Sequence, residues 1–471
     1  MRSRRRELSL HQATVKEAKL VQLVVQNAAV IVTDWSSAPI LNGWIAISDG
    51  KVSEIGTGAS PNAPETIDAD GCLVYPGAVA AHHHLFQGTS RGVSSPGGLL
   101  GWLGTQYRAW ARLTPADVES AALASLSLLA LGGCTTVASF EYIHPVGSDF
   151  VTPVVSAAEK IGLRLLYVRG CAPRLEGELA DQLESVGVDL TRLREPEDVA
   201  LARTREVLSR PQSDRLRWAC GPTTPIIDDG GSFQRELNKI ADEFEVGIHT
   251  HFHPLPGQLA DGESAFDFAS RLGLIRHGNW FAHGSRLSTN DVAALGDAGV
   301  GVVHCPSCSL QLGYDIPPLA DWAAANDRLA VSVDGAASND RGSMLLESQL
   351  AWQAQRARFG GAPNLLSANQ ALGLTTAGGA RAINWPELGG LAVGRPADLA
   401  IVDFGSIDYA GIPLSERAKP AELLMKVYAG APVRDLIVGE RIVLRQGKFV
   451  SIDLSAVITA ANGTAEALHG R

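Results

Sequence analysis

The chain has 471 residues, 45% of them hydrophobic, and a formal net charge of −10. This length suits a large barrel with an appended domain, and the negative charge argues against a nucleic-acid partner. The sequence shows no secretory signal and no apolar run long enough to span a membrane, so we expect no membrane partner. The six cysteines are scattered, with a single C-x-x-C pair at Cys305 and Cys308, and we expect all six to be reduced thiols of a cytoplasmic protein that mostly pack in the core.

Residues 1–70 are expected to form a tail and part of a small β-domain. The first 20 residues are polar and are predicted to be poorly ordered. From Leu23 onward, short apolar runs are separated by turn residues, and the Asp49–Gly50 pair is a strong signal for a hairpin turn.

Residues 71–390 have a different rhythm, in which apolar strand-like runs alternate with helical segments such as 114–131 and 233–244. The eight runs are residues 72–85, 132–145, 163–171, 216–225, 246–254, 279–288, 299–308 and 329–340. Eight strands, each followed by a helix, predict an α/β fold of the (β/α)8 TIM-barrel class, in which the strands are buried on both faces.

Residues 391–471 return to short strands and turns. Because the barrel already has its eight strands, we expect this segment to pair with the first 70 residues in one small β-sandwich beside the barrel. Residues 455–471 are predicted to be a mobile tail.

Histidines gather in the strands of the predicted barrel, and nine of the 12 lie in or just after them. In a strand, alternation points His82 and His84 to the same face, where two imidazoles can hold one divalent metal ion. Barrel enzymes build their sites at such strand ends. The later strands end in further candidates, which are His249, His251, His253, His283, His304 and Asp334. A buried Asp334 without a partner would be costly, and a metal ion removes that cost.

The order of these residues resembles the amidohydrolase superfamily over residues 22–452. The motifs PGAVAAHHHLFQ, HTH, HCP, VDGAASND and GRPADLAIVD look like the branch of triazine chlorohydrolases and of guanine, 8-oxoguanine and pterin deaminases. The resemblance implies a metal-bearing (β/α)8 barrel with a β-sandwich built from both termini. It implies that the metal ligands are His82, His84, His251 and Asp334. His283 would hold the attacking water or substrate and could touch the metal, and His304 would hydrogen-bond the reacting oxygen.

The number and kind of metal ion also follow from the resemblance. Binuclear relatives bridge two metals with a carboxylated lysine on the fourth strand, and here residues 216–225, LRWACGPTTP, contain no lysine. We therefore expect one metal ion. Zinc is the first choice for this histidine-rich set, although iron, manganese or cobalt would also be accepted.

The fifth strand departs from the deaminases of this branch. They carry a glutamate three residues after the metal-binding histidine, and here that place is taken by Pro254. Hydrolysis of a urea or carbamate needs no proton on a ring nitrogen, and Asp334 alone could move the water proton. The sequence therefore favours hydrolysis of a carbonyl C–N or C–S bond, most like the phenylurea and thiocarbamate (molinate) hydrolases. The expected substrate is an N-aryl urea, with Asp334, His304 and His283 as catalytic residues.

Two alternatives stay open. The first is an aminohydrolase of a pterin, purine or triazine, in which Glu141 or His253 replaces the missing glutamate. The second is a metal-binding barrel without catalysis, against which the intact pair of His304 and Asp334 argues.

The substrate is expected to be a small molecule with an apolar body. Leucines and aromatic residues at 99–110 could form a wall for it. The predicted substrate contacts are Gln87, Trp102, Glu141, His144, His253 and Asn339. We expect the chain to assemble as a homo-oligomer.

Overall fold

The computed structural model describes residues 20–93, 95, 98–145, 147–173, 178–224, 231–254, 259–360 and 364–470. The predicted poorly ordered start lies outside these residues, except for the exposed Leu20. Within the described chain, no helix is both long enough and apolar enough to cross a membrane. All six cysteines are free thiols, as predicted.

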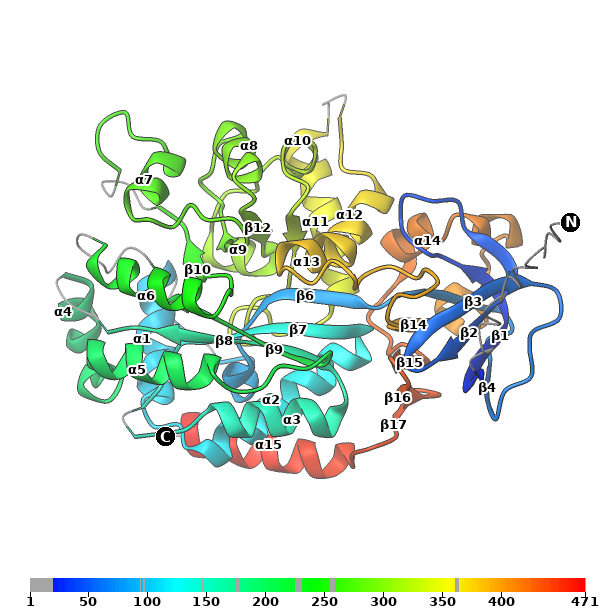
Figure 1. The fold of residues 1–471 in the computed structure, drawn as a ribbon, viewed down its shortest axis with the longest axis horizontal. Coiled ribbons are helices and arrows are strands. Elements are labelled where there is room, and N and C mark those ends of the chain that lie inside the picture. The colour runs from blue at the N-terminus through cyan, green and yellow to red at the C-terminus, as the bar shows by residue number, and fades with distance from the viewer. Residues whose placement is uncertain are drawn as a thin grey trace, which may run out of the picture.

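Eight parallel strands lie at the centre of the molecule, one in each of the predicted runs (Figure 1). They are β6 (Ala78–His83), β7 (Cys134–Glu141), β8 (Arg164–Cys171), β9 (Leu216–Pro222), β10 (His249–Phe252), β11 (Trp280–His283), β12 (Gly301–His304) and β13 (Leu329–Val331). Their near-continuous apolar sequences are buried throughout β6, β7 and β8, as strands covered on both faces require.

The eight strands form two four-stranded sheets, β6 to β9 and β10 to β13. A single parallel bridge between Cys220 and Ile248 joins the two sheets on one side. On the other side, the hydroxyl of Ser332 donates to the carbonyl of His82 at 2.9 Å and accepts from its N–H at 3.1 Å. A closed ladder is not found, because the strands from β10 to β13 have only three or four residues each and make few bonds at the seams.

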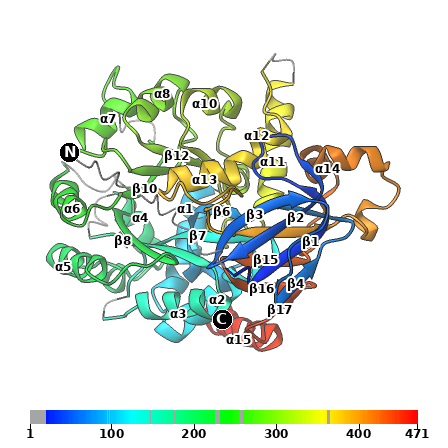
Figure 2. The same cartoon turned by 45° about the vertical axis from the view of Figure 1, so that its right-hand side comes forward.

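Helices surround these strands (Figures 1 and 2). Those between the strands are α1 (Gly98–Trp110), α2 (Pro115–Leu131), α3 (Val151–Ile161), α4 (Glu178–Ser185), α5 (Glu197–Leu208), α6 (Ser232–Glu243), α7 (Ala265–Arg271), α8 (Thr289–Asp297), α9 (Pro306–Leu312) and α10 (Leu319–Ala325), and those after β13 are α11 (Met344–Phe359), α12 (Ala368–Thr375) and α13 (Ala377–Ala382). The predicted helix at 114–131 starts at a capping box between Thr114 and Asp117, with Pro115 in its first turn.

Strands from both chain ends form one nine-stranded sheet at the side of the molecule (Figure 2). Its members are β1 (Leu23–Ile31), β2 (Ile40–Ser48), β3 (Lys51–Thr57), β4 (Glu65–Asp68), β5 (Cys72–Pro76), β14 (Leu399–Asp403), β15 (Asp435–Val438), β16 (Arg441–Arg445) and β17 (Lys448–Phe449). The sheet branches along β1, which bends at Asn27 with a φ of 58° and pairs first with β4 and then with β5. The pairing of both ends is confirmed, but two separate layers of a sandwich are not.

Two details differ from the predicted order of elements. The first run, 72–85, is two strands, since β5 pairs with β14 in the terminal sheet and only β6 belongs to the parallel sheet. The chain turns between them at Gly77, where a Cβ atom would lie 2.2 Å from the side chain of Thr135. The predicted tail at 455–471 is wrong as far as residue 469, because α15 (Leu454–His469) packs on α2. A boundary between domains near residues 70 and 390 stays a prediction.

A buried ion pair connects the parallel strands to the terminal sheet. Arg164 of β8 donates to both carboxylate oxygens of Asp398, at 2.7 and 2.9 Å, and both side chains are about 3% exposed. Asp398 also accepts from the N–H of Gly439, just before β16. The Arg164 guanidinium lies 3.8 Å from a second carboxylate, Asp214, whose side chain is 85% exposed.

This arrangement gives a matched pair of variants. Asp398→Ala leaves a buried guanidinium without its partner and should lower the free energy of unfolding by about 3–5 kcal/mol. Asp214→Asn removes a solvent-screened charge and should change it by less than about 1 kcal/mol. Urea unfolding followed by circular dichroism measures both. Equal effects of the two substitutions would show that the buried pair does not hold the parallel strands and the terminal sheet together.

Candidate metal centre

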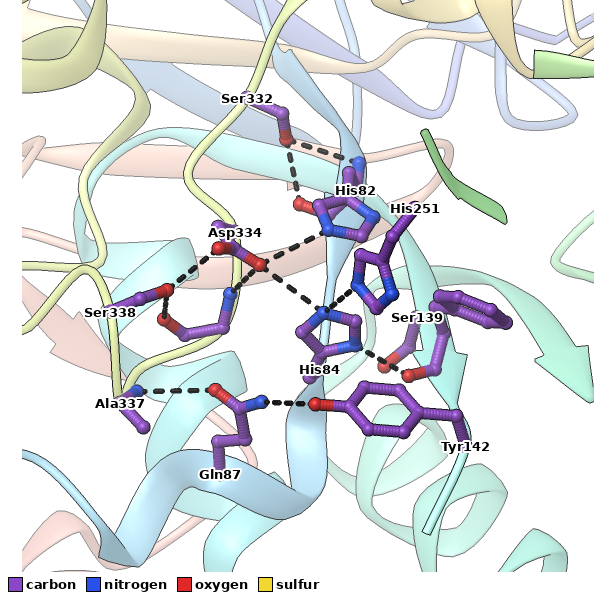
Figure 3. A network of polar contacts seen from close by, with 12 residues as sticks. His82, His84, Gln87, Ser139, Tyr142, His251, Ser332, Asp334, Ala337 and Ser338 are labelled. Carbon is purple, nitrogen blue, oxygen red and sulfur yellow. Dashed lines mark hydrogen bonds and ion pairs between the residues drawn. The ribbon is translucent and has the colours of Figure 1, made fainter. Parts of the chain in front are cut away.

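Four of the predicted ligands converge at the carboxyl ends of the parallel strands (Figure 3). The Nε2 atoms of His82 and His84 lie 3.1 and 3.2 Å from the same carboxylate oxygen, Oδ1 of Asp334. His251 reaches this point from β10, with its Nε2 atom 3.1 Å from Nε2 of His84. Alternation along β6 therefore does place the pair 82 and 84 on one face, as predicted.

Backbone carbonyl groups behind two of the rings fix which nitrogen carries the proton. Nδ1 of His84 lies 2.6 Å from the carbonyl oxygen of Phe140, and Nδ1 of His251 lies 2.7 Å from that of Thr223. A carbonyl can only accept, so each Nδ1 must donate. Each Nε2 atom is then left with a lone pair that faces the other ring.

His82 is oriented in the same way through a second histidine. Nδ1 of His249 lies 2.8 Å from the carbonyl of Trp280 and must donate to it. Its Nε2 atom therefore accepts from Nδ1 of His82, 2.7 Å away. The ring of His249 is stacked on Trp280, at 4.7 Å between centroids, which holds it in this position. Nε2 of His82 again keeps its lone pair, and it is buried with no hydrogen-bond partner.

Three lone pairs and a carboxylate oxygen thus face one another with no hydrogen between them. Burial holds the pKa of His82 and of His251 well below the ordinary value, so these rings do not take up a proton to relieve the repulsion. A divalent cation relieves it, and three imidazoles with one carboxylate are ligands that zinc and related ions accept. The residues present therefore fit a divalent metal ion.

His283 and Asp334, which lie beside this centre, each have a strained backbone conformation. Their φ angles are 75° and 64°, in the left-handed region that non-glycine residues rarely adopt. Asp334 is fixed there because its carboxylate accepts from the N–H of Gly335 and from the hydroxyl of Ser338, both at 2.7 Å. Ligand atoms of His283 lie within 4.8 Å of those of His82 and His251, and its Nδ1 atom is buried without a partner. Strain at such positions is typical of functional sites.

A cavity of about 190 Å³ opens directly onto these residues. Its inner end is polar and includes His84, His251, His283 and Asp334. Its outer wall is apolar, and α1 supplies Leu99, Trp102, Leu103 and Tyr107 at helical spacing, with further leucines from α4 and α9. One face of α1 is therefore turned to the cavity, which favours a substrate wall for part of the segment 99–110.

The structure separates the predicted substrate contacts into two groups. Trp102 and His253 line the cavity. Gln87 lies just behind it, between the hydroxyl of Tyr142 and the N–H of Ala337 (Figure 3).

The remaining predicted contacts do not line the cavity and are held by protein groups. Glu141 accepts from the N–H of Leu85 at 3.0 Å, His144 faces the carbonyls of Glu141 and Gly170, and Asn339 donates to Glu347 at 2.8 Å. His304 hydrogen-bonds the backbone of His283 and does not line the cavity either.

Several residues of the site had no signal in the sequence analysis. Tyr314 lies on His253, at 4.2 Å between ring centroids, and Thr223, Leu183 and Leu312 line the cavity from loops and helices without a recognisable motif. Cys308 also lines it, although this thiol is only 2% exposed and packs in the core as expected. The C-x-x-C spacing drew notice to Cys308, but it did not reveal what the side chain faces.

Parallel strands with a histidine and aspartate metal centre at their carboxyl ends define a metal-dependent hydrolase. The profile of the amidohydrolase family matches residues 73–443, so the chain belongs to this family. Its activity class is hydrolysis of carbon–nitrogen bonds other than peptide bonds.

Comparisons with known proteins indicate which proteins this chain resembles. The chain is 31% identical to 8-oxoguanine deaminase of Pseudomonas aeruginosa, over 90% of this chain and 95% of the relative. It is 30% identical to hydroxydechloroatrazine ethylaminohydrolase of Pseudomonas sp. strain ADP, over 92% and 93% of the two chains. The structure of atrazine chlorohydrolase from Arthrobacter aurescens TC1, complexed with zinc, matches the fold with a TM-score of 0.84 and 24% identity, over 94% of this chain and 100% of that one. The expected likeness to phenylurea and thiocarbamate hydrolases is not confirmed, and the deaminase alternative fits these relatives better.

The role of His249 can be tested through metal affinity. His249→Phe keeps the stack on Trp280 but removes the acceptor for Nδ1 of His82, so the affinity for the metal should fall roughly 10- to 100-fold. Competition with a chelator measures this. His253→Phe, on the cavity wall, should leave the affinity unchanged. The same loss in both variants would contradict the orienting role of His249.

Proposed function

We propose that this chain is an aminohydrolase that removes an amino or alkylamino group from an aromatic nitrogen heterocycle, such as a purine, pterin or triazine, using one zinc ion. The observation that carries this proposal is the set of lone pairs on His82, His84 and His251 facing Asp334 at the end of an aromatic-lined cavity. The names of the relatives support it, because an oxopurine deaminase and a triazine aminohydrolase both act on ring amines. A third relative, 31% identical over 88% of this chain and 93% of its own length, is an isoxanthopterin deaminase from an unknown prokaryotic organism.

The proposal includes the architecture that this chemistry needs. The two parallel sheets would act as one (β/α)8 barrel, and the branched terminal sheet would correspond to the expected β-sandwich. A homo-oligomer in the cytoplasm remains our expectation.

In this mechanism the metal ion, held by His82, His84, His251 and Asp334, would supply Lewis acidity that acidifies a water molecule. Asp334 accepts the proton of that water as the water attacks the ring carbon bearing the amino group. The hydroxyl of Ser338 and the N–H of Gly335 keep the carboxylate oriented for this transfer. Protonated Asp334 then delivers the proton to the departing nitrogen.

Pro254 takes the position at which related deaminases carry a glutamate. A ring nitrogen of the substrate therefore has no carboxylate partner from this position. Of the two candidates for that role, Glu141 is turned to the backbone of Leu85 and does not line the cavity. His253 does line it, and its Nε2 atom accepts from Arg286 at 3.3 Å. This contact puts the ring proton of neutral His253 on Nδ1, which is buried and has no partner. We therefore assign His253 as the donor to the ring nitrogen on which charge develops during attack.

His304 has a less direct role in this scheme. Its hydrogen bond to the backbone of His283 supports the left-handed conformation there. His283 then binds the attacking water or the substrate.

The cavity wall indicates an apolar substituent on the ring. Leu99, Trp102 and Leu103 face the cavity from α1, and the indole N–H of Trp102 is already bonded to the carbonyl of Ala337 at 2.8 Å. Trp102 therefore offers the substrate its ring surface and not a hydrogen bond. An alkyl or aryl group on the heterocycle would cover this surface.

Product analysis tests the reaction class. The metal-loaded enzyme is incubated with aminated purines, pterins and triazines, with and without alkyl substituents, and with N-aryl ureas, and products are identified by mass. We expect release of ammonia or an alkylamine from a heterocycle and none with Asp334→Asn, which cannot accept the water proton. Cleavage of the ureas alone would support the second candidate, carbonyl C–N hydrolysis, which the missing glutamate at Pro254 favours.

A further pair of variants tests the donor to the ring nitrogen. His253→Phe should lower kcat/KM for the heterocycle by roughly 10- to 100-fold, the value of one hydrogen bond to a developing charge. Glu141→Gln, which can keep its bond to Leu85, should change kcat/KM little. A large loss in the Glu141 variant with an intact His253 variant would reverse this assignment, provided that both proteins unfold at the wild-type temperature.

A further inference from the structure

One soft ligand stands beside the metal centre and has no part in the reaction proposed above. The thiol of Cys308 lines the cavity, on α9 directly after β12. This helix begins at Pro306, and Cys308 lies in its first turn. The side chain is therefore held by a helix and not by a loop. All six thiols are buried, and the other five do not line this cavity.

Cys308 is one member of a second group of ligand atoms. Its sulfur, a carboxylate oxygen of Asp334 and a ring nitrogen of His283 all lie within 4.8 Å of one another. Among the described residues, this is the only such group that contains sulfur, and it shares Asp334 with the group formed with His82 and His84. Nδ1 of His283 is buried without a hydrogen-bond partner, so a ligand nitrogen is available there.

The chemistry of this group differs from that of the first centre. Three imidazoles and a carboxylate form the first centre, whereas thiolate, imidazole and carboxylate form the second. A thiolate selects soft or borderline ions, and one carboxylate can bridge two ions through its two oxygens. Asp334 offers Oδ1 to His82 and His84, and its Oδ2 atom lies on the side of Ser338.

We propose that His283, Cys308 and Asp334 form a second, inhibitory site for a thiophilic divalent cation such as Cd²⁺ or excess Zn²⁺. Binding replaces the proton on the Cys308 sulfur by the metal ion, and that proton leaves to the solvent without any change in oxidation state. The second ion engages Asp334 and His283, the groups that the proposed reaction uses for proton transfer and for water. Turnover therefore stops while the first metal stays in place.

Cadmium is the probe for this site, because a thiolate bound to Cd²⁺ has a charge-transfer band in the ultraviolet that imidazole and carboxylate ligands lack. The protein with its tightly bound metal is titrated with Cd²⁺ while the difference spectrum and the total metal per chain after dialysis are measured. Wild type should gain the band and a second equivalent of metal. Cys308→Ser should lose the band and keep one equivalent. Cys72→Ser, which changes a buried thiol in the terminal sheet, should behave as wild type.

A band that persists in Cys308→Ser would overturn the proposal, and so would a second equivalent of metal that Cys308→Ser still binds. An unchanged wild-type spectrum would do the same. None of these measurements needs a substrate, so they stand even if the aminohydrolase assignment fails. With a substrate in hand, Cd²⁺ should inhibit wild type as the band grows, while Cys308→Ser keeps its own activity at the same Cd²⁺ concentration. Circular dichroism verifies that each variant is folded.

Discussion

The hydrogen bonds behind the imidazole rings are the constraint on which the whole site depends. The carbonyls of Phe140 and Thr223 each accept from an Nδ1 atom, and this leaves His84 and His251 with lone pairs on the inner side. His249 does the same for His82, although it is not itself one of the proposed ligands. Because Phe140 lies in β7 and Thr223 directly follows β9, the fold itself determines the protonation pattern. The site is thus prepared for a cation before any cation arrives, and neutral rings in a buried position are what make it so.

The fold could be predicted to a large extent from the sequence, because its signals are repetitive. Eight apolar runs with helices between them are enough to indicate parallel strands, and the histidines mark which strand ends carry the site. The limits are equally physical. The run 72–85 reads as one strand, since the turn at Gly77 depends on its close approach to Thr135, a contact across the sheets. Likewise α15, although Asp453 caps its start, buries only Val457 and Leu468, so its sequence gives little indication that it packs on α2.

Of the candidate site, the convergence of the proposed metal ligands was predictable, whereas the cavity lining was predictable only along α1. The ligands His82, His84 and Asp334 follow from strand alternation and from the cost of burying a charge. The direction of the Glu141 side chain does not follow from the sequence, because its position at the end of β7 suits a cavity residue equally well. Its carboxylate instead accepts from the N–H of Leu85 and from the hydroxyl of Ser139. Specificity thus depends on long-range packing, and relatives that share the ligands can differ in substrate.

The terminal sheet has a consequence for how the protein is made. Strand β5 pairs with β1 on one side and with β14 on the other, and β5 and β14 are roughly 320 residues apart in the chain. During synthesis the edge of β5 stays open for on the order of 15–65 s, the time a ribosome needs to add those residues. Strand β6, with two of the metal-binding histidines, begins two residues after β5. A nascent chain that is released early therefore exposes a β-edge next to a half-built metal centre, and such fragments are natural substrates for chaperones and proteases.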